Sequence, residues 1–127
     1  MPTIAEVMRS EWIDVAPEDT LGEVADRMTG LNMGAAVVRD FGRLIGIITE
    51  RDLLKAMAAR VHTSEARVRE WMTPDPVTAA HDTDVDEAAR VMVERGFRHL
   101  PVLDESGQVA GVVSLRRVVA AATSIVR

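Results

Sequence analysis

Residues 46–52 join a short apolar run to a helix start and place two oxygen-bearing side chains there. Thr49 supplies a hydroxyl, and Asp52 supplies a carboxylate three residues later. This pattern is typical of a capping box, in which both side chains bond to backbone N–H groups at the start of a helix. The same groups suit a ligand, because a helix N-terminus attracts phosphate and a carboxylate accepts hydrogen bonds from sugar hydroxyls. Both interpretations, a cap and a binding site, remain open here.

A second stretch, residues 111–117, keeps the hydroxyl at Ser114 but has Arg117 in place of the carboxylate. A cation in the first turn of a helix opposes the helix dipole by roughly 0.3–1 kcal/mol. The fold therefore tolerates the loss of a capping carboxylate at this position. Arg117 and the neighbouring Arg116 invite a bound anion, although a solvated pair of surface arginines explains them equally well.

Both stretches belong to an internal repeat that covers most of the chain. The two copies align at a constant shift, with a one-residue insertion in the second copy. Matched pairs include Met8 with Met72, Glu23 with Glu87, Asp40 with Asp104, Gly46 with Gly111 and Thr49 with Ser114. We expect a single module, residues 1–127, built from a first copy at 4–57, a linker at 58–67 and a second copy at 68–122. Each copy is too small to bury its own apolar face, so the two should pack about a pseudo-two-fold axis.

Each copy should contain one amphipathic helix that begins at a capping box. The boxes are residues 20–23 and 84–87, and apolar residues follow each box at helical spacing. We expect Gly30 and Gly96 to end these helices, because glycine adopts the left-handed conformation that commonly follows a helix.

A β-hairpin should follow each of these helices, since short apolar runs flank turn residues in both copies. The expected strands are residues 35–38 with 44–48, and 100–103 with 109–113. A closing helix comes next, at residues 50–57 in the first copy and 115 to about 122 in the second. The predicted fold class is therefore mixed α/β (α+β), with a short helix, a strand, a helix, two strands and a helix in each copy.

The composition excludes several classes of protein. The chain of 127 residues has a formal net charge of −5, which argues against nucleic-acid binding because that function requires a basic face. It contains no cysteine, and no apolar run is long enough to span a membrane. We expect a soluble, cytoplasmic protein with no nucleic-acid or membrane partner.

Neither catalysis nor metal binding finds support in the sequence. No Ser/His/Asp constellation, phosphate-binding Walker loop or dinucleotide-binding glycine motif occurs, so no residues are predicted to be catalytic. The three histidines, His62, His81 and His99, do not lie at metal-ligand spacings, and no metal site is expected.

Several motifs together resemble a known family. They are the methionines Met8 and Met72 that open the two copies, the sequence MTPDPV at 72–77, the sequence RHLPVLD at 98–104, and the two Gly-x-x-[Thr/Ser] strand ends. In this order and at this spacing, the chain resembles a tandem pair of cystathionine-β-synthase (CBS) domains, a Bateman module, over essentially its whole length.

The resemblance implies two pseudo-symmetric β-α-β-β-α units packed sheet to sheet, with up to two clefts between the repeats. Such clefts bind adenosine-containing ligands such as AMP, ATP or S-adenosylmethionine, in a sensor that requires no cofactor. The resemblance also implies a homodimer formed through the helices and, in some cases, a regulated partner protein. The function expected is adenine-nucleotide-binding regulation, as in energy or metabolite sensing.

The resemblance also implies roles for individual residues. Asp52 corresponds to the residue that holds the ribose hydroxyls, Thr49 lies near phosphate, and Ile13 with the neighbouring Asp14 lies beside the base. From the second copy, Arg98, His99 and Arg116 are candidates to face the phosphates of the same cleft.

Arg117 departs from the family pattern, so one competent site per chain is expected. The main alternative function is a ligand-free dimerisation or interaction module that acts as a scaffold. A nucleic-acid-binding regulator is a further alternative, which the net negative charge of the chain disfavours.

Overall fold

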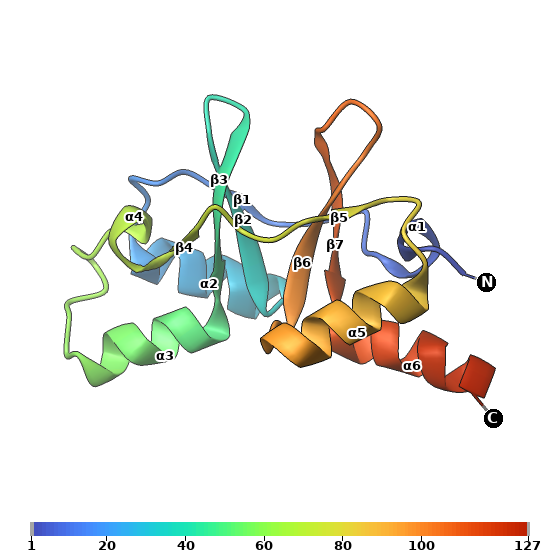
Figure 1. Ribbon diagram of the computed structural model, residues 1–127. Coiled ribbons are helices and arrows are strands. Elements are labelled where there is room, and N and C mark those ends of the chain that lie inside the picture. The colour runs from blue at the N-terminus through green and yellow to red at the C-terminus, as the bar shows by residue number, and fades with distance from the viewer. Residues whose placement is uncertain (1, 127) are drawn as a thin grey trace. The chain divides into compact units, whose positions relative to one another are not determined.

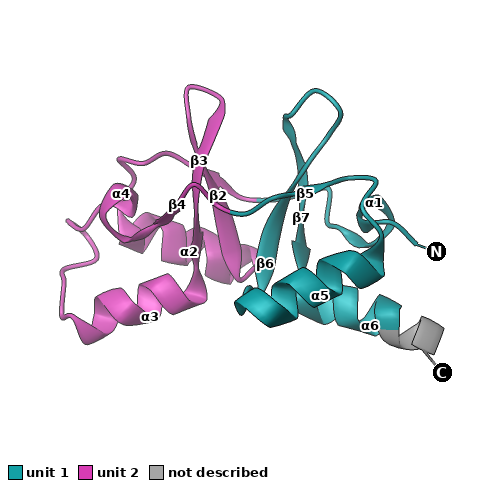
Figure 2. Ribbon diagram, in the orientation of Figure 1, with its two compact units in different colours: residues 1–12, 77–127 teal, residues 13–76 magenta. Residues whose placement is uncertain are grey.

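The computed structural model describes residues 2–126, with side chains up to residue 122 (Figure 1). The chain forms two compact units, each with a small sheet and helices (Figure 2). Unit 2 is continuous and comprises residues 13–76, whereas unit 1 combines the residues up to 12 with those from 77 onwards. The predicted mixed α/β class, with its two hairpins and their flanking helices, is confirmed.

Unit 2 is built on a four-stranded sheet in the order β1-β2-β3-β4. Strand β1 (Asp14–Val15) runs parallel to β2 (Ala35–Asp40), which forms an antiparallel hairpin with β3 (Arg43–Thr49). Strand β4 (Thr73–Pro74) pairs antiparallel with β3. The helices of this unit are α2 (Leu21–Leu31), α3 (Glu50–Ala58) and α4 (Val68–Trp71).

Unit 1 repeats this plan with a three-stranded sheet in the order β5-β6-β7. Strand β5 (Ala79–Ala80) runs parallel to β6 (His99–Leu103), and β6 forms an antiparallel hairpin with β7 (Val109–Ser114). Its helices are α1 (Ile4–Val7), α5 (Val85–Arg95) and α6 (Leu115–Val126).

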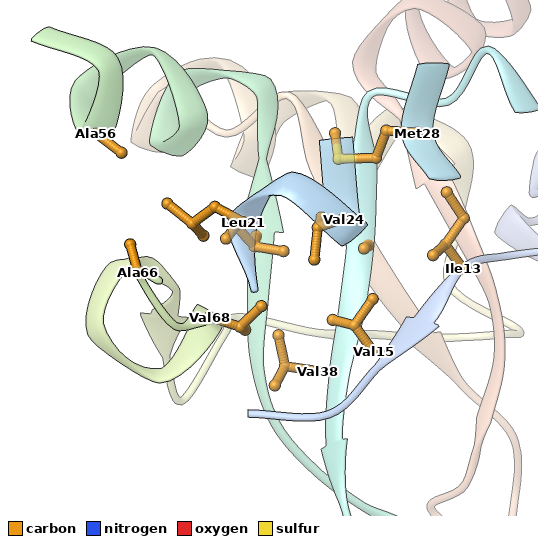
Figure 3. Packing of buried hydrophobic residues seen from close by; sticks show 11 residues of the cluster. Ile13, Val15, Leu21, Val24, Met28, Val38, Ala56, Ala66 and Val68 are labelled. Atoms are coloured by element: carbon orange, nitrogen blue, oxygen red, sulfur yellow. The ribbon is translucent and has the colours of Figure 1, made fainter. Parts of the chain in front are cut away.

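The strands of unit 2 have two different faces, because successive side chains of a strand point to opposite sides of a sheet. One face packs against the helices in a single apolar cluster (Figure 3). The cluster consists of Ile13, Val15, Leu21, Val24, Met28, Ala36, Val38, Ile48, Ala56, Ala66 and Val68. The other face carries Ala35, Val37 and Ile47, which are buried but lie outside this cluster. Polar residues that could bind a ligand share this second face, as described below.

The caps of α2 were predicted correctly at its start and wrongly at its end. The capping box of Thr20 and Glu23 is formed, with the backbone N–H of Glu23 donating to the Thr20 hydroxyl at 3.2 Å. Gly30 does not end the helix, which continues through Leu31. Asn32 adopts the left-handed conformation instead, at φ 53°. Asparagine tolerates this conformation because its short polar side chain bonds locally.

The caps of α5 show the opposite outcome. Gly96 follows the helix with φ 74°, as predicted. The predicted capping box at its start is wrong, because Asp84 makes no side-chain cap bond and its buried Oδ1 has no hydrogen-bond partner among the described residues. The backbone N–H of Val85 donates to the carbonyl of Pro2 at 3.0 Å, so the N-terminal segment supplies the acceptor at this helix end.

The compact units do not coincide with the sequence repeats, because the opening segments are exchanged. Helix α1 opens the first repeat but belongs to unit 1, where Arg9 and Val112 exchange backbone hydrogen bonds at 2.9 and 3.1 Å. Helix α4 opens the second repeat but belongs to unit 2.

Each exchanged segment packs against a strand of the other repeat, and a glycine in that strand permits the contact. A Cβ atom on Gly46 would lie 2.6 Å from Sδ of Met72 and 2.9 Å from the carbonyl oxygen of Thr73. A Cβ atom on Gly111 would lie 2.5 Å from the carbonyl oxygen of Arg9. Both distances to backbone oxygens are shorter than real Cβ contacts, so the close approach of the exchanged segment requires glycine.

Candidate functional site

The junction of β3 and α3 forms the capping box that its sequence indicates. Oδ2 of Asp52 accepts hydrogen bonds from the backbone N–H of Thr49 at 2.9 Å and from its hydroxyl at 3.2 Å. Asp52 is 8% exposed and is the one buried charged residue in the part of the chain that the structure describes. The capping interpretation therefore holds, and it accounts for one of the two carboxylate oxygens.

The second carboxylate oxygen of Asp52 is the more informative atom for function. Within the described residues, Oδ1 accepts no hydrogen bond. Oδ1 is not among the fully buried atoms that lack a partner in the described residues, so water or a ligand can reach it. Oδ1 of Asp52 can therefore accept a hydrogen bond from a ligand hydroxyl while Oδ2 continues to cap α3.

The structure places Ile13 and Asp14 in different surroundings. The Ile13 side chain is fully buried in the apolar cluster, and its carbonyl accepts the N–H of Val37 at 2.8 Å. Asp14 is half-buried, and its carboxylate accepts two hydrogen bonds from the guanidinium of Arg39, one from Nε at 2.9 Å and one from Nη2. Of these two residues, only Asp14 has a side chain that a ligand can reach.

The strand register places Asp14 and Thr49 on the same face of the sheet. Asp14 pairs with Val37, which pairs with Ile47, while Thr49 pairs with Ala35 two residues along β2. Adjacent strands lie about 4.8 Å apart and two residues along a strand span about 6.7 Å, so Asp14 and Thr49 are separated by about 12 Å on this face. One small molecule can therefore contact both residues.

Arg98, His99 and Arg116 lie near one another at one end of the unit 1 hairpin. The carbonyl of Arg98 accepts the N–H of Leu115 at 2.8 Å, which ties the start of β6 to the start of α6. His99 pairs with Ser114, and Arg116 is exposed in the first turn of α6. Two cations and an imidazole are thus available in unit 1, and their role toward a ligand stays a prediction.

The helix start in unit 1 is capped without a carboxylate. The N–H of Arg117 donates to the Ser114 hydroxyl at 3.3 Å, and the Arg117 side chain is exposed. Unit 1 therefore offers no carboxylate at the position that Asp52 occupies in unit 2.

Sequence reasoning missed two residues, Arg39 and Arg27. Arg39 binds the carboxylate of Asp14, and Nη1 of Arg27 donates to the Asp14 carbonyl at 2.5 Å. A weak signal was present for Arg39, because it follows the four apolar residues that begin β2 and its counterpart in the second copy is Leu103. The contact of α2 with β1 through Arg27 had no local signal.

The described residues contain neither a membrane-spanning helix nor a cluster of metal ligands. No helix there is both long and apolar enough to cross a membrane. No group of three or more histidine, cysteine, aspartate or glutamate residues in the same part of the chain could hold a metal ion.

Comparison with family models matches residues 4–59 and 68–124 to the CBS domain. The protein belongs to the CBS-domain family. The CBS-domain pair that the sequence motifs indicated is thereby confirmed. A 17.7 kDa protein of Acidianus ambivalens is 37% identical over 114 residues, which are 89% of this chain and 68% of that protein. The chain spans 59% of another curated relative and 20–22% of three more.

Solved structures of CBS-domain pairs share the fold of this chain. CBSX2 of Arabidopsis thaliana, in complex with AMP, has a TM-score of 0.78 at 27% identity, and the match covers 98% of both chains. The CBS domain pair of protein MJ0100, in complex with 5′-methylthioadenosine and S-adenosyl-L-methionine, has a TM-score of 0.86 at 26% identity. That match covers 94% of this chain and 98% of the other. The ligands in both complexes contain adenosine.

Proposed function

We propose that this CBS-domain pair is a regulatory module that binds an adenosine-containing small molecule, of the AMP, ATP or S-adenosylmethionine class, and that it is not an enzyme. The observation that carries the proposal is the buried carboxylate of Asp52, whose Oδ1 has no hydrogen-bond partner among the described residues. The adenosine ligands of the related pairs support it.

Three residues of unit 2 have roles in this proposal. Oδ1 of Asp52 accepts a hydrogen bond from a ribose hydroxyl. Thr49 and the N-terminus of α3 lie toward the phosphate, which the helix dipole attracts. Asp14, about 12 Å from Thr49 on the same face of the sheet, lies beside the base.

The second repeat does not provide a second site of this kind. Arg117 stands at the position of Asp52, so the acceptor for the ribose hydroxyls is replaced by a cation. The expected stoichiometry is therefore one ligand per chain. The assignment of Arg98, His99 and Arg116 to the phosphate is tested by removing each side chain and comparing AMP with adenosine, because only the phosphate-bearing ligand should lose affinity.

Occupancy of the site would be transmitted through a homodimer or to a partner protein. Light scattering on the intact chain, with and without AMP, tests the homodimer. A mass equal to one chain under both conditions would contradict it.

Isothermal titration calorimetry with the conservative variant Asp52→Asn tests the ligand site. The asparagine keeps a carbonyl oxygen for the N–H of Thr49 but loses the charged acceptor. A hydrogen bond to a charged group contributes about 1.5–3 kcal/mol, so AMP or ATP should bind at least about tenfold more weakly.

Glu50→Gln is the matched control, because it removes the same charge from an exposed position in the same helix turn. It should bind as the wild type does. An Asp52→Asn variant that binds with wild-type affinity would refute the assignment of Asp52 to the ribose.

The alternative is a scaffold or interaction module without a ligand. The hydrogen-bonded capping box favours the scaffold, because Thr49 and Asp52 already have a structural role. Thermal shift measurements with AMP, ADP, ATP, S-adenosylmethionine and NAD separate the two functions. Stabilisation by none of the five would favour the scaffold.

A further inference from the structure

Asp14 and Arg39 form a two-point ion pair on the face of the unit 2 sheet that also carries Ala35, Val37 and Ile47. Nε of Arg39 donates to Oδ1 of Asp14 at 2.9 Å, and Nη2 donates to Oδ2. The side chains are 28% exposed for Arg39 and 40% exposed for Asp14. The pair is thus held in one geometry and remains open to a ligand.

The fold itself does not require this pair. The corresponding positions in the second repeat are Thr78 and Leu103, and the sheet of unit 1 forms with the same parallel and antiparallel pairings. Partly exposed ion pairs contribute little to stability. The pair occurs in the same repeat as Asp52, the residue to which the proposed function assigns the ribose.

The two purine bases differ in the hydrogen-bonding groups along one edge. Adenine presents an amino donor beside a ring-nitrogen acceptor, whereas guanine presents two adjacent N–H donors on the same edge. A carboxylate without a partner offers two acceptors and matches guanine. A carboxylate joined to a guanidinium offers an acceptor beside a donor and matches adenine.

We propose that the Asp14–Arg39 pair selects adenine over guanine, an inference that rests on the proposed function. A carboxylate offers about four acceptor positions, of which Arg39 occupies one on each oxygen, and the proposal assigns another to the adenine amino group. The remaining N–H groups of Arg39 donate to the ring nitrogen. The same N–H groups oppose the donors of guanine, so Arg39 is the residue that determines specificity.

Arg27 and the sheet fix the pair in position. Nη1 of Arg27 donates to the carbonyl of Asp14, and β1 is held parallel to β2 at Asp14 and Val15. Arg39 follows an irregularity in the β2–β3 register, between Val38 and Arg39. Such irregularities re-aim a side chain.

Calorimetry of the intact protein with AMP and GMP tests the proposal. The wild type should prefer AMP at least about tenfold, within the range for one two-point base contact. In Arg39→Met the preference should fall below about threefold, mainly because GMP binds more tightly. Arg43→Met is the matched control, since Arg43 lies in the same hairpin and its exposed side chain makes no hydrogen bond or ion pair with any described residue. It should keep the wild-type ratio.

The outcomes distinguish this proposal from the proposed function. A wild type that binds neither GMP nor any of AMP, ADP, ATP, S-adenosylmethionine and NAD overturns both. A wild type that binds AMP but shows no preference over GMP overturns the selectivity alone, as does an Arg39→Met variant that keeps the wild-type ratio. If circular dichroism shows Arg39→Met to be unfolded, Asp14→Ala provides the test. It should weaken AMP at least about fivefold without any gain for GMP, and unchanged AMP binding would overturn the proposal.

Discussion

Replacing Gly46 with alanine should destabilise the protein because the exchanged segment packs directly on this residue. Gly46 lies in β3, pairs with Val38 on one side and with Pro74 on the other, and is buried. The added Cβ would lie 2.6 Å from Sδ of Met72 and 2.9 Å from the carbonyl oxygen of Thr73. The methionine sulfur can move aside, but the Thr73 oxygen is backbone, so β4 must shift away from β3.

The expected loss of stability in Gly46→Ala follows from the cost of overpacking. An extra methyl group forced into a packed site typically destabilises a protein by about 1–3 kcal/mol. Gly30→Ala is the matched control, because Gly30 lies inside α2 and a Cβ atom added there would meet no atom within 4 Å. That substitution should stabilise the helix by about 0.5–1 kcal/mol. Both variants change the unfolded chain in the same way, so their difference reflects the folded state.

Urea unfolding followed by circular dichroism measures both variants. We expect the free energies of unfolding to differ by about 1.5–4 kcal/mol, with Gly46→Ala the less stable. Equal slopes of the unfolding free energy against urea would show that the change lies in stability itself. If Gly46→Ala were as stable as the wild type, the close approach of β4 would not be a constraint and the reasoning would be refuted.

Two further predictions concern local structure. Glu23 accepts hydrogen bonds from the backbone N–H and the hydroxyl of Thr20, which lower its pKa below 4.5. The stability that Glu23 adds is therefore present above pH 4.5 and is lost as the pH falls through the lowered pKa. The melting temperatures of wild type and Glu23→Gln should therefore converge between pH 7 and pH 3. A constant difference in melting temperature would contradict this. Phe41 is fully exposed at the hairpin tip with φ 51°, so Phe41→Gly should raise the free energy of unfolding by up to about 1 kcal/mol. If urea unfolding showed Phe41→Gly to be less stable than the wild type, the Phe41 ring would contribute to stability despite its exposure.

The features that the sequence predicted are those with a local or periodic signal. Hairpins, the amphipathic helices and the repeat follow from residue spacing, and the capping box at Thr49 follows from two side chains three residues apart. Asp84 has the same pattern and forms no cap, and the carbonyl of Pro2 accepts the N–H of Val85 at that helix end. Distant contacts of this kind leave no local signature.

The candidate site was predicted in part for the same reason. Asp52 and Thr49 stand in a short motif, whereas Arg39 reaches Asp14 from 25 residues away and Arg27 reaches it from a helix. Arg39 stands beside the charged Asp40 at the end of β2, so the sequence alone did not indicate a distant partner for it. Only the register of β1 on β2 identifies that partner as Asp14.

The exchange of opening segments also bears on the order in which the chain folds during synthesis. Unit 2 is continuous, so all of its elements have been made once residue 76 has left the ribosome. Helix α1 is made before unit 2, yet its partners are made after unit 2, among them Val85, which bonds to Pro2, and Val112, which bonds to Arg9. Unit 2 should therefore fold first, with the N-terminal segment unpaired until the second repeat emerges. Removing residues 1–12 should accordingly damage unit 1, which contains most of the second repeat, and leave unit 2 intact.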